Sequence, residues 1–178
     1  MKRGPRQPVG SSMRLCLVRH GLANWPSWQG VDAERPLNPA GIRLIRAVGP
    51  RLASLGLRPD LLLHSPYRRA QQTAEILAEA LGATDRLQAH DGLRPGFNDK
   101  ELKKLLTAHA RRSELMLVGH APDVANVLRS LTGAVSRFKE GAAALLEVDE
   151  LDKDPAGTLL WLIPADVWTT VEAASPAP

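Results

Sequence analysis

Two arginines and two histidines in this chain could together bind and transfer a phosphoryl group: Arg19, His20, Arg69 and His120. Each lies shortly after an apolar run, and the three runs occupy residues 15–18, 61–63 and 115–118. Arginine presents a fixed fork of donors to phosphate oxygens. A neutral histidine nitrogen can attack phosphorus and hold the phosphoryl group as a covalent intermediate. These residue types therefore indicate a phosphate site with His20 as a candidate nucleophile.

The histidines and arginines also have simpler interpretations. A histidine at the end of a strand is most often a structural hydrogen-bonding residue. A zinc site is another possibility if His20, His64, His90 and His120 cluster, but the chain has no His-x-x-x-His pair and no set of cysteine ligands. We therefore expect no metal and no other cofactor.

The elements that must position these residues alternate between buried strands and amphipathic helices. Helices are predicted to begin after Asn38-Pro39, Ser65-Pro66, Asn98 and Pro122, where capping residues or prolines stand before an apolar face of helical spacing. A short strand is predicted within 87–93, and two late strands at 142–148 and 158–163 are predicted to be joined by a turn at 152–157. Continuous apolar strands separated by such helices are typical of a mostly parallel α/β sheet covered on both faces, a three-layer α/β/α sandwich. Because ligands bind outside the carboxyl ends of the strands in such folds, the three strand ends should meet at one edge.

Length and composition set the broader limits. The 178 residues fit one domain, which we place at 13–172, with disordered tails at 1–12 and 173–178. No apolar run is long enough to span a membrane, and the basic N-terminal stretch lacks the apolar core of a secretory signal. The single cysteine, in the apolar run at 15–18, predicts a reduced, cytoplasmic protein. The net charge of +4 suits an anionic partner, but 4% aromatic residues are too few for a nucleic-acid surface.

Three motifs, in order along the chain, resemble the histidine phosphatase (phosphoglycerate mutase-like) superfamily. They are the Arg-His-Gly at 19–21, the Ser-Pro-x-x-Arg-Ala-x-Gln-Thr at 65–73, and the Gly-His at 119–120. The segment 32–41, Asp-Ala-Glu-Arg-Pro-Leu-Asn-Pro-Ala-Gly, and the absence of a long insert between residues 73 and 117 resemble the small phosphohistidine phosphatases of the SixA type.

The resemblance implies a role for each matching residue. His20 corresponds to the nucleophile, Arg19 and Arg69 to the arginines that clamp the phosphate, and His120 to the second histidine of the family. Ala70 and the Gln-Thr pair at 72–73 select Arg69 rather than Arg68. In the loop after His20, Asn24 can reach a phosphate oxygen, although a role in the turn is an equal alternative.

One departure from the family concerns the acid that protonates the leaving group. Many members have a glutamate after the third strand, and the corresponding region 87–95 has none; Asp91 is the nearest substitute. An alcohol leaving group needs a proton, whereas the imidazole of phosphohistidine leaves more readily. The missing glutamate therefore favours a phosphohistidine substrate, with Asp91 as the possible acid.

The predicted function is a metal-independent phosphatase with a covalent phosphohistidine intermediate on His20, acting on phosphohistidine in a protein partner. Two alternatives stay open: a phosphatase of small-molecule or Ser/Thr phosphomonoesters, and a non-enzymatic module on the same fold that binds phosphate or a partner. The oligomeric state is not predicted.

Overall fold

The computed structural model describes residues 12–149, 151 and 155–170. Residues 1–11 of the predicted tail at 1–12, the whole predicted tail at 173–178 and residues 152–154 of the predicted turn at 152–157 lie outside these residues. The prediction is wrong for Ser12, Ala156 and Gly157, which belong to strands because they pair in the sheet. Within the described residues, six strands form one sheet: β1 (Ser12–Arg19), β2 (Leu61–His64), β3 (Leu87–Ala89), β4 (Glu114–Gly119), β5 (Ala143–Asp149) and β6 (Ala156–Ile163). The helices are α1 (Pro39–Ser54), α2 (Arg68–Leu81), α3 (Asp99–Ala108), α4 (Asp123–Thr132) and α5 (Ala165–Thr170), with short 3-10 turns at Asp32–Glu34, Thr84–Arg86 and Asp91–Leu93.

The strand order is β3-β2-β4-β1-β5-β6. The first four strands in this order are mutually parallel, whereas β5 pairs antiparallel with both β1 and β6. The prediction of a mostly parallel sheet is therefore confirmed. Because β1, β4 and β2 are parallel neighbours, their carboxyl ends lie side by side at one edge, and β5 begins at that same edge.

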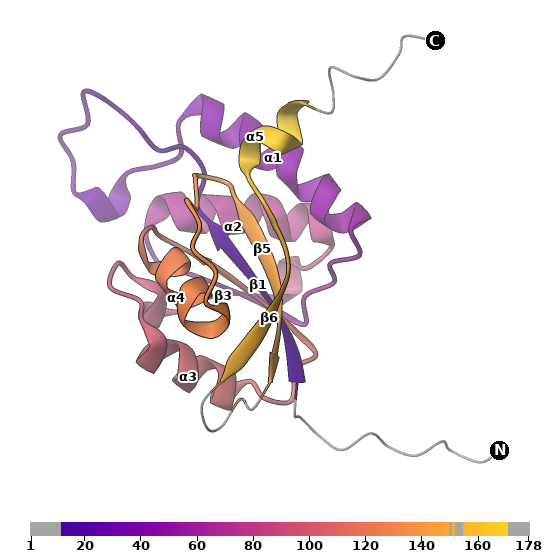
Figure 1. Ribbon diagram of the computed structural model, residues 1–178. Coiled ribbons are helices and arrows are strands. Elements are labelled where there is room, and N and C mark those ends of the chain that lie inside the picture. The colour runs from indigo at the N-terminus through magenta and orange to yellow at the C-terminus, as the bar shows by residue number, and fades with distance from the viewer. Residues whose placement is uncertain (1–11, 150, 152–154, 171–178) are drawn as a thin grey trace, which may run out of the picture.

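Helices cover both faces of the sheet, which gives the predicted three layers (Figure 1). Alternate residues of β1 point to opposite faces, as strand geometry requires. Leu15 and Leu17 pack in a core with α3 and α4, while Cys16 and Val18 pack in a second core with α1, α2 and α5. This two-sided burial explains why the strand reads as a continuous apolar run. None of the described helices is long and apolar enough to cross a membrane.

Most predicted helix starts are confirmed, and one is wrong. Asn38 accepts a hydrogen bond from the Gly41 amide at the start of α1, and Asn98 caps α3. The Ser65-Pro66 start is displaced, because α2 begins at Arg68 with Tyr67 before it. Ser65 Oγ does accept a hydrogen bond from the Tyr67 amide, but it also contacts His120, so it serves a turn and a tertiary contact. Helix α5 was not predicted from the sequence.

A glycine near the start of α1 lets the loop after β1 lie against this helix. A Cβ atom at Gly41 would stand 2.1 Å from the carbonyl oxygen of Leu22, and the same carbonyl accepts a hydrogen bond from the Asn38 amide. A side chain at this position would push away the backbone that follows the first motif.

Replacing Gly41 with alanine is therefore expected to lower the free energy of unfolding by about 1–3 kcal/mol, the usual cost of overpacking a filled site. Urea unfolding measures it, with Pro39→Ala at an exposed position of the same helix turn as the control. A Gly41→Ala protein as stable as the control would contradict this interpretation of the close approach.

Candidate active site

An open pocket of about 490 Å³ lies at the edge where β1, β2 and β4 end. Its polar lining consists of three arginines, two histidines, two carboxylates and one amide: Arg19, Arg35, Arg69, His20, His120, Asp32, Glu140 and Asn24. The structure thus brings together Arg19, His20, Arg69, His120 and Asn24, as predicted. With both histidines neutral, these side chains carry a net charge of +1, which suits an anionic ligand.

The geometry around His20 identifies which of its nitrogens can react. Nδ1 lies 2.7 Å from the carbonyl oxygen of Gly21, an acceptor, so Nδ1 carries the proton. The Nε of Arg69 donates to His20 Nε2 at 3.2 Å, which requires a lone pair on Nε2. Both contacts therefore give the same tautomer, with an unprotonated Nε2.

The Arg-His-Gly motif is anchored from behind by α2. The amide of Gly21 donates to Thr73 Oγ1 at 3.0 Å, and this hydroxyl donates to the carbonyl of Arg69 at 2.7 Å. A Cβ at Gly21 would meet the side chain of Ile45 at 2.8 Å, so the position needs a glycine. Gln72 accepts from the Leu37 amide at 2.7 Å and ties the loop before α1 to the same helix. Thr73 of the second motif thus fixes the first motif in place, and Gln72 fixes the loop before α1.

Both histidines are held neutral by their surroundings. Burial, and then the charges of Arg69 and Arg19, lower the pKa of His20 to about 4 against the raising effect of its hydrogen bond to Gly21. Burial, and then His20 and Arg69, lower the pKa of His120 to about 3. The two rings meet edge to face with centroids 5.2 Å apart. Near neutral pH, His20 therefore keeps the lone pair that a nucleophile needs.

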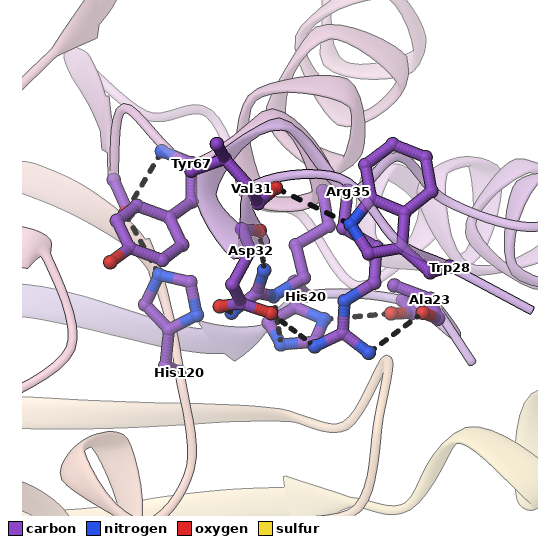
Figure 2. Close-up of polar contacts among 11 residues, drawn as sticks. His20, Ala23, Trp28, Val31, Asp32, Arg35, Tyr67 and His120 are labelled. Atoms are coloured by element: carbon purple, nitrogen blue, oxygen red, sulfur yellow. Dashed lines mark hydrogen bonds and ion pairs between the residues drawn. The ribbon is translucent and has the colours of Figure 1, made fainter. Parts of the chain in front are cut away.

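Each of the two predicted clamping arginines is paired with a carboxylate. Arg19 donates to Glu140 Oε1 at 2.6 Å and to the carbonyl of Phe138 at 2.9 Å. Arg69 donates to Asp32, both to its backbone carbonyl at 2.8 Å and to Oδ2 at 3.0 Å. In Figure 2, the Asp32 side chain lies between the ring of His120 on one side and the side chains of His20 and Arg35 on the other. Both arginine–carboxylate pairs must loosen if phosphate is to take both donors of each guanidinium fork.

Asp32 is a carboxylate rather than an acid in this arrangement. Burial would raise its pKa, but hydrogen bonds and charge from Arg69 and Arg35 outweigh that effect and lower it. Arg35 pairs with Asp32 Oδ1 at 2.7 Å. Asp32 is therefore a poor proton donor to a leaving group near neutral pH.

The structure does not bring Asp91, the predicted acid, into the pocket. Its side chain is 82% exposed and pairs with Arg94 at 2.9 Å. Residues 91–93 form a 3-10 turn that places this carboxylate at the surface, and Pro95 is the nearby residue that lines the pocket.

Several residues in the pocket or beside it were not predicted from the sequence. Arg35 and Asp32 belong to the segment that carried the SixA-type resemblance, but nothing in their spacing showed that they face His20. Tyr67 lies under the guanidinium of Arg69, with the ring centroid 5.0 Å from Cζ, and its ring meets His120 edge to face. Glu140 had no sequence signal beyond its place before a late strand. His64 is buried beside the site, with Nδ1 2.8 Å from the carbonyl of Ser65, and does not line the pocket.

A buried histidine with an unprotonated Nε2 beside Arg69, in a pocket that Arg19 also lines at the carboxyl edge of an α/β sheet, indicates the class of phosphoryl-transfer proteins that use a histidine. A family model of the histidine phosphatase superfamily (branch 1) matches residues 15–116. The chain belongs to this superfamily.

Individual curated proteins also match part of the chain. An uncharacterized protein of Picosynechococcus is 39% identical over 115 residues, which are 63% of this chain and 68% of that protein. A 2,3-bisphosphoglycerate-dependent phosphoglycerate mutase of Methylobacterium is 38% identical over 77 residues, which are 40% of this chain and only 35% of that protein.

The solved structures that resemble this fold include small phosphatases. The protein histidine phosphatase SixA, complexed with tungstate, matches with a TM-score of 0.78 at 24% identity, over 87% of this chain and 99% of that one. A SixA described as a putative phosphohistidine phosphatase, from Agrobacterium tumefaciens, matches with a TM-score of 0.73 at 25% identity, over 85% and 97%. The predicted phosphoglycerate mutase-like fold of the SixA type is confirmed, and family and fold together support a phosphatase.

The lowered histidine pKa values predict that the protein loses stability in mild acid. The unfolded chain protonates both imidazoles near pH 6.5, whereas the folded protein keeps them neutral down to about pH 4 for His20 and pH 3 for His120. The unfolded state therefore binds more protons as the pH falls from 6.5 towards 4, and the free energy of unfolding decreases through that window. Urea unfolding at about pH 7 and about pH 5 measures the loss.

The control for this prediction is His120→Gln, which cannot titrate and should show a smaller loss between the two pH values. A wild-type protein that is equally stable at both, or a variant with the same loss as wild type, would contradict the neutral assignment of His120.

Proposed function

We propose that this protein is a phosphatase that forms a covalent phosphohistidine on Nε2 of His20, with phosphohistidine on a protein as its substrate and no metal requirement. The observation that carries the proposal is the unprotonated Nε2 of His20, which contacts the guanidinium of Arg69 in a pocket that Arg19 also lines. Arg19 and Arg69 offer donors to a phosphoryl group, and their charge opposes the charge that develops in the transition state.

The first step forms one bond and breaks another. Nε2 of His20 attacks phosphorus while the bond from phosphorus to the substrate nitrogen breaks, and the Nε–H of Arg69 turns from Nε2 to a phosphoryl oxygen. The leaving imidazole takes its proton from solvent. The second step is the attack of water on the phosphohistidine, which returns the neutral imidazole and releases orthophosphate.

The pairing of the pocket carboxylates supports the proposed substrate class. Asp32 is held as a carboxylate by Arg69 and Arg35, Glu140 is paired with Arg19, and Asp91 lies outside the pocket. No described carboxylate of the pocket is therefore placed as a free acid. An alcohol leaving group would need such an acid, and the imidazole of phosphohistidine needs it less. A solved relative of similar fold is described as a putative phosphohistidine phosphatase, which supports the same choice.

The test is to trap and classify the phosphoenzyme, and then to compare substrates. Rapid quenching with a ³²P-labelled phosphohistidine protein should give a labelled chain that is stable in alkali and labile in acid, as expected for a phosphorus–nitrogen bond. Turnover of that protein should exceed turnover of a panel of small phosphomonoesters, without added metal and in the presence of a chelator. An acid-stable adduct would contradict the nucleophile, and a clear preference for the monoester panel would contradict the substrate.

Removing the charge of Asp32 is expected to raise the affinity of the pocket for orthophosphate. Because its carboxylate competes with an anion for Arg69, replacing Asp32 with asparagine should tighten competitive inhibition by orthophosphate by about tenfold. The measurement is the inhibition constant for orthophosphate at fixed ionic strength.

Asp91→Asn is the matched control, because its carboxylate pairs with an arginine outside the pocket. This variant should keep the inhibition constant of the wild type. Weaker inhibition in Asp32→Asn would show that the carboxylate supports phosphate binding rather than opposing it.

A further inference from the structure

The hydroxyl of Ser65 makes a contact that the proposed mechanism does not use. Ser65 directly follows β2 and is completely buried, with 0% of its surface exposed. Its Oγ lies 2.8 Å from Nε2 of His120, and the amide of Tyr67 donates to the same oxygen at 3.3 Å. This oxygen therefore connects the turn before α2 to the second histidine of the pocket.

The proton count at this oxygen determines the direction of the contact with His120. A serine hydroxyl has one proton to donate and two lone pairs that accept. The Tyr67 amide occupies one lone pair. Among the contacts that the described residues make to Ser65 Oγ, only Nε2 of His120 can accept the hydroxyl proton. If Nε2 donated instead, the completely buried hydroxyl proton would have no acceptor and the Nδ1 lone pair would have no donor. With the hydroxyl as the donor, only the Nδ1–H of His120 lacks a partner, and His120 lines the pocket where a ligand can supply one.

The other ring nitrogen of His120 is then the donor. Nδ1 is buried and has no hydrogen-bond partner among the described residues. His120 lines the pocket, and in Figure 2 its ring nitrogen without a dashed line is on the side of Asp32 and His20. An Nδ1–H there would point a donor towards the space where a phosphoryl oxygen binds.

We propose that Ser65 is a positioning residue that holds neutral His120 in the Nδ1–H tautomer, so that an uncharged ring offers phosphate a donor instead of a lone pair. The opposite tautomer would turn a lone pair towards a phosphoryl oxygen and repel it. The phosphate-binding part of this inference rests on the proposed function, whereas the tautomer itself does not.

The tautomer can be observed directly in the wild-type protein without ligand. Two-bond ¹H–¹⁵N correlation spectra of the imidazoles near pH 7, assigned by comparison with His120→Gln, should show the His120 proton on Nδ1. A proton on Nε2 would overturn the proposal whatever the variants do. This measurement needs no variant of Ser65 to fold.

The role of Ser65 is then tested with Ser65→Ala. We expect a mixture of the two His120 tautomers, and binding of orthophosphate weakened by about tenfold with kcat less affected than KM. The control is Ser130→Ala, which removes a surface hydroxyl that bonds Asp99 and should change neither readout. An unchanged tautomer together with unchanged phosphate affinity in Ser65→Ala would overturn the proposal.

Failure of the proposed function would give a different result. In that case the wild-type protein would form no phosphoenzyme, while the His120 proton would still lie on Nδ1. The trapping experiment and the spectra therefore separate the two proposals.

Discussion

Replacing His20 with alanine is expected to reduce phosphatase turnover by about 10⁴-fold or more, because the variant has no nitrogen to accept the phosphoryl group. The labelled phosphoenzyme should disappear at the same time. Arg19, Arg69 and His120 stay in place, so the variant should still bind orthophosphate. Turnover is measured with the phosphohistidine protein, and the adduct by rapid quenching.

The control for this variant is His109→Ala. His109 follows the last residue of α3 and does not line the pocket, so its loss should leave both turnover and adduct unchanged. A His20→Ala protein that is folded and keeps wild-type turnover would remove His20 from the mechanism.

The second large effect is expected at Arg69. Replacing it with alanine should lower kcat/KM by about 10²–10³-fold, because the variant loses a charged donor that faces the transferred group. The change should also raise the pKa of His20, since the positive charge of Arg69 helps to lower it. Steady-state kinetics and an NMR titration of the His20 ring measure the two effects.

Arg68→Ala is a closely matched control, because it removes the neighbouring arginine in the same turn of α2. Arg68 does not line the pocket, and its loss should leave kcat/KM for a small phosphate ester unchanged. Equal losses in the two variants would show that the local positive charge matters and the position of Arg69 does not.

The strand ends were predictable from the sequence because the signals are local. Apolar runs at 15–18, 61–63 and 115–118 correspond to β1, β2 and β4, and the rule that parallel strands present their carboxyl ends at one edge then brings His20, Arg69 and His120 together. Burial of both faces keeps these strands apolar, so the signal is strong. Helix α5 was missed because its six residues are too few to show a periodic pattern.

The carboxylates of the pocket could not be predicted in the same way. Asp32 reaches Arg69 across 37 residues because its loop folds back over the site, and loop paths carry no periodic signal. Glu140 reaches Arg19 across 121 residues because β5 is antiparallel to β1 and therefore begins at the edge where β1 ends. A sequence pattern shows that a strand is present but not its direction in the sheet.

The sequence by itself determined the fold class, the family and the four residues proposed to carry the phosphate chemistry, because these depend on local patterns and on one general rule about sheet edges. The tertiary structure alone decided how those residues are protonated and paired. The unprotonated Nε2 of His20 depends on the Gly21 carbonyl and on Arg69, and the inferred proton of His120 depends on a buried serine from a different strand end. Proton positions follow from hydrogen bonds between residues that are distant in the chain, so they are settled only when the chain has folded.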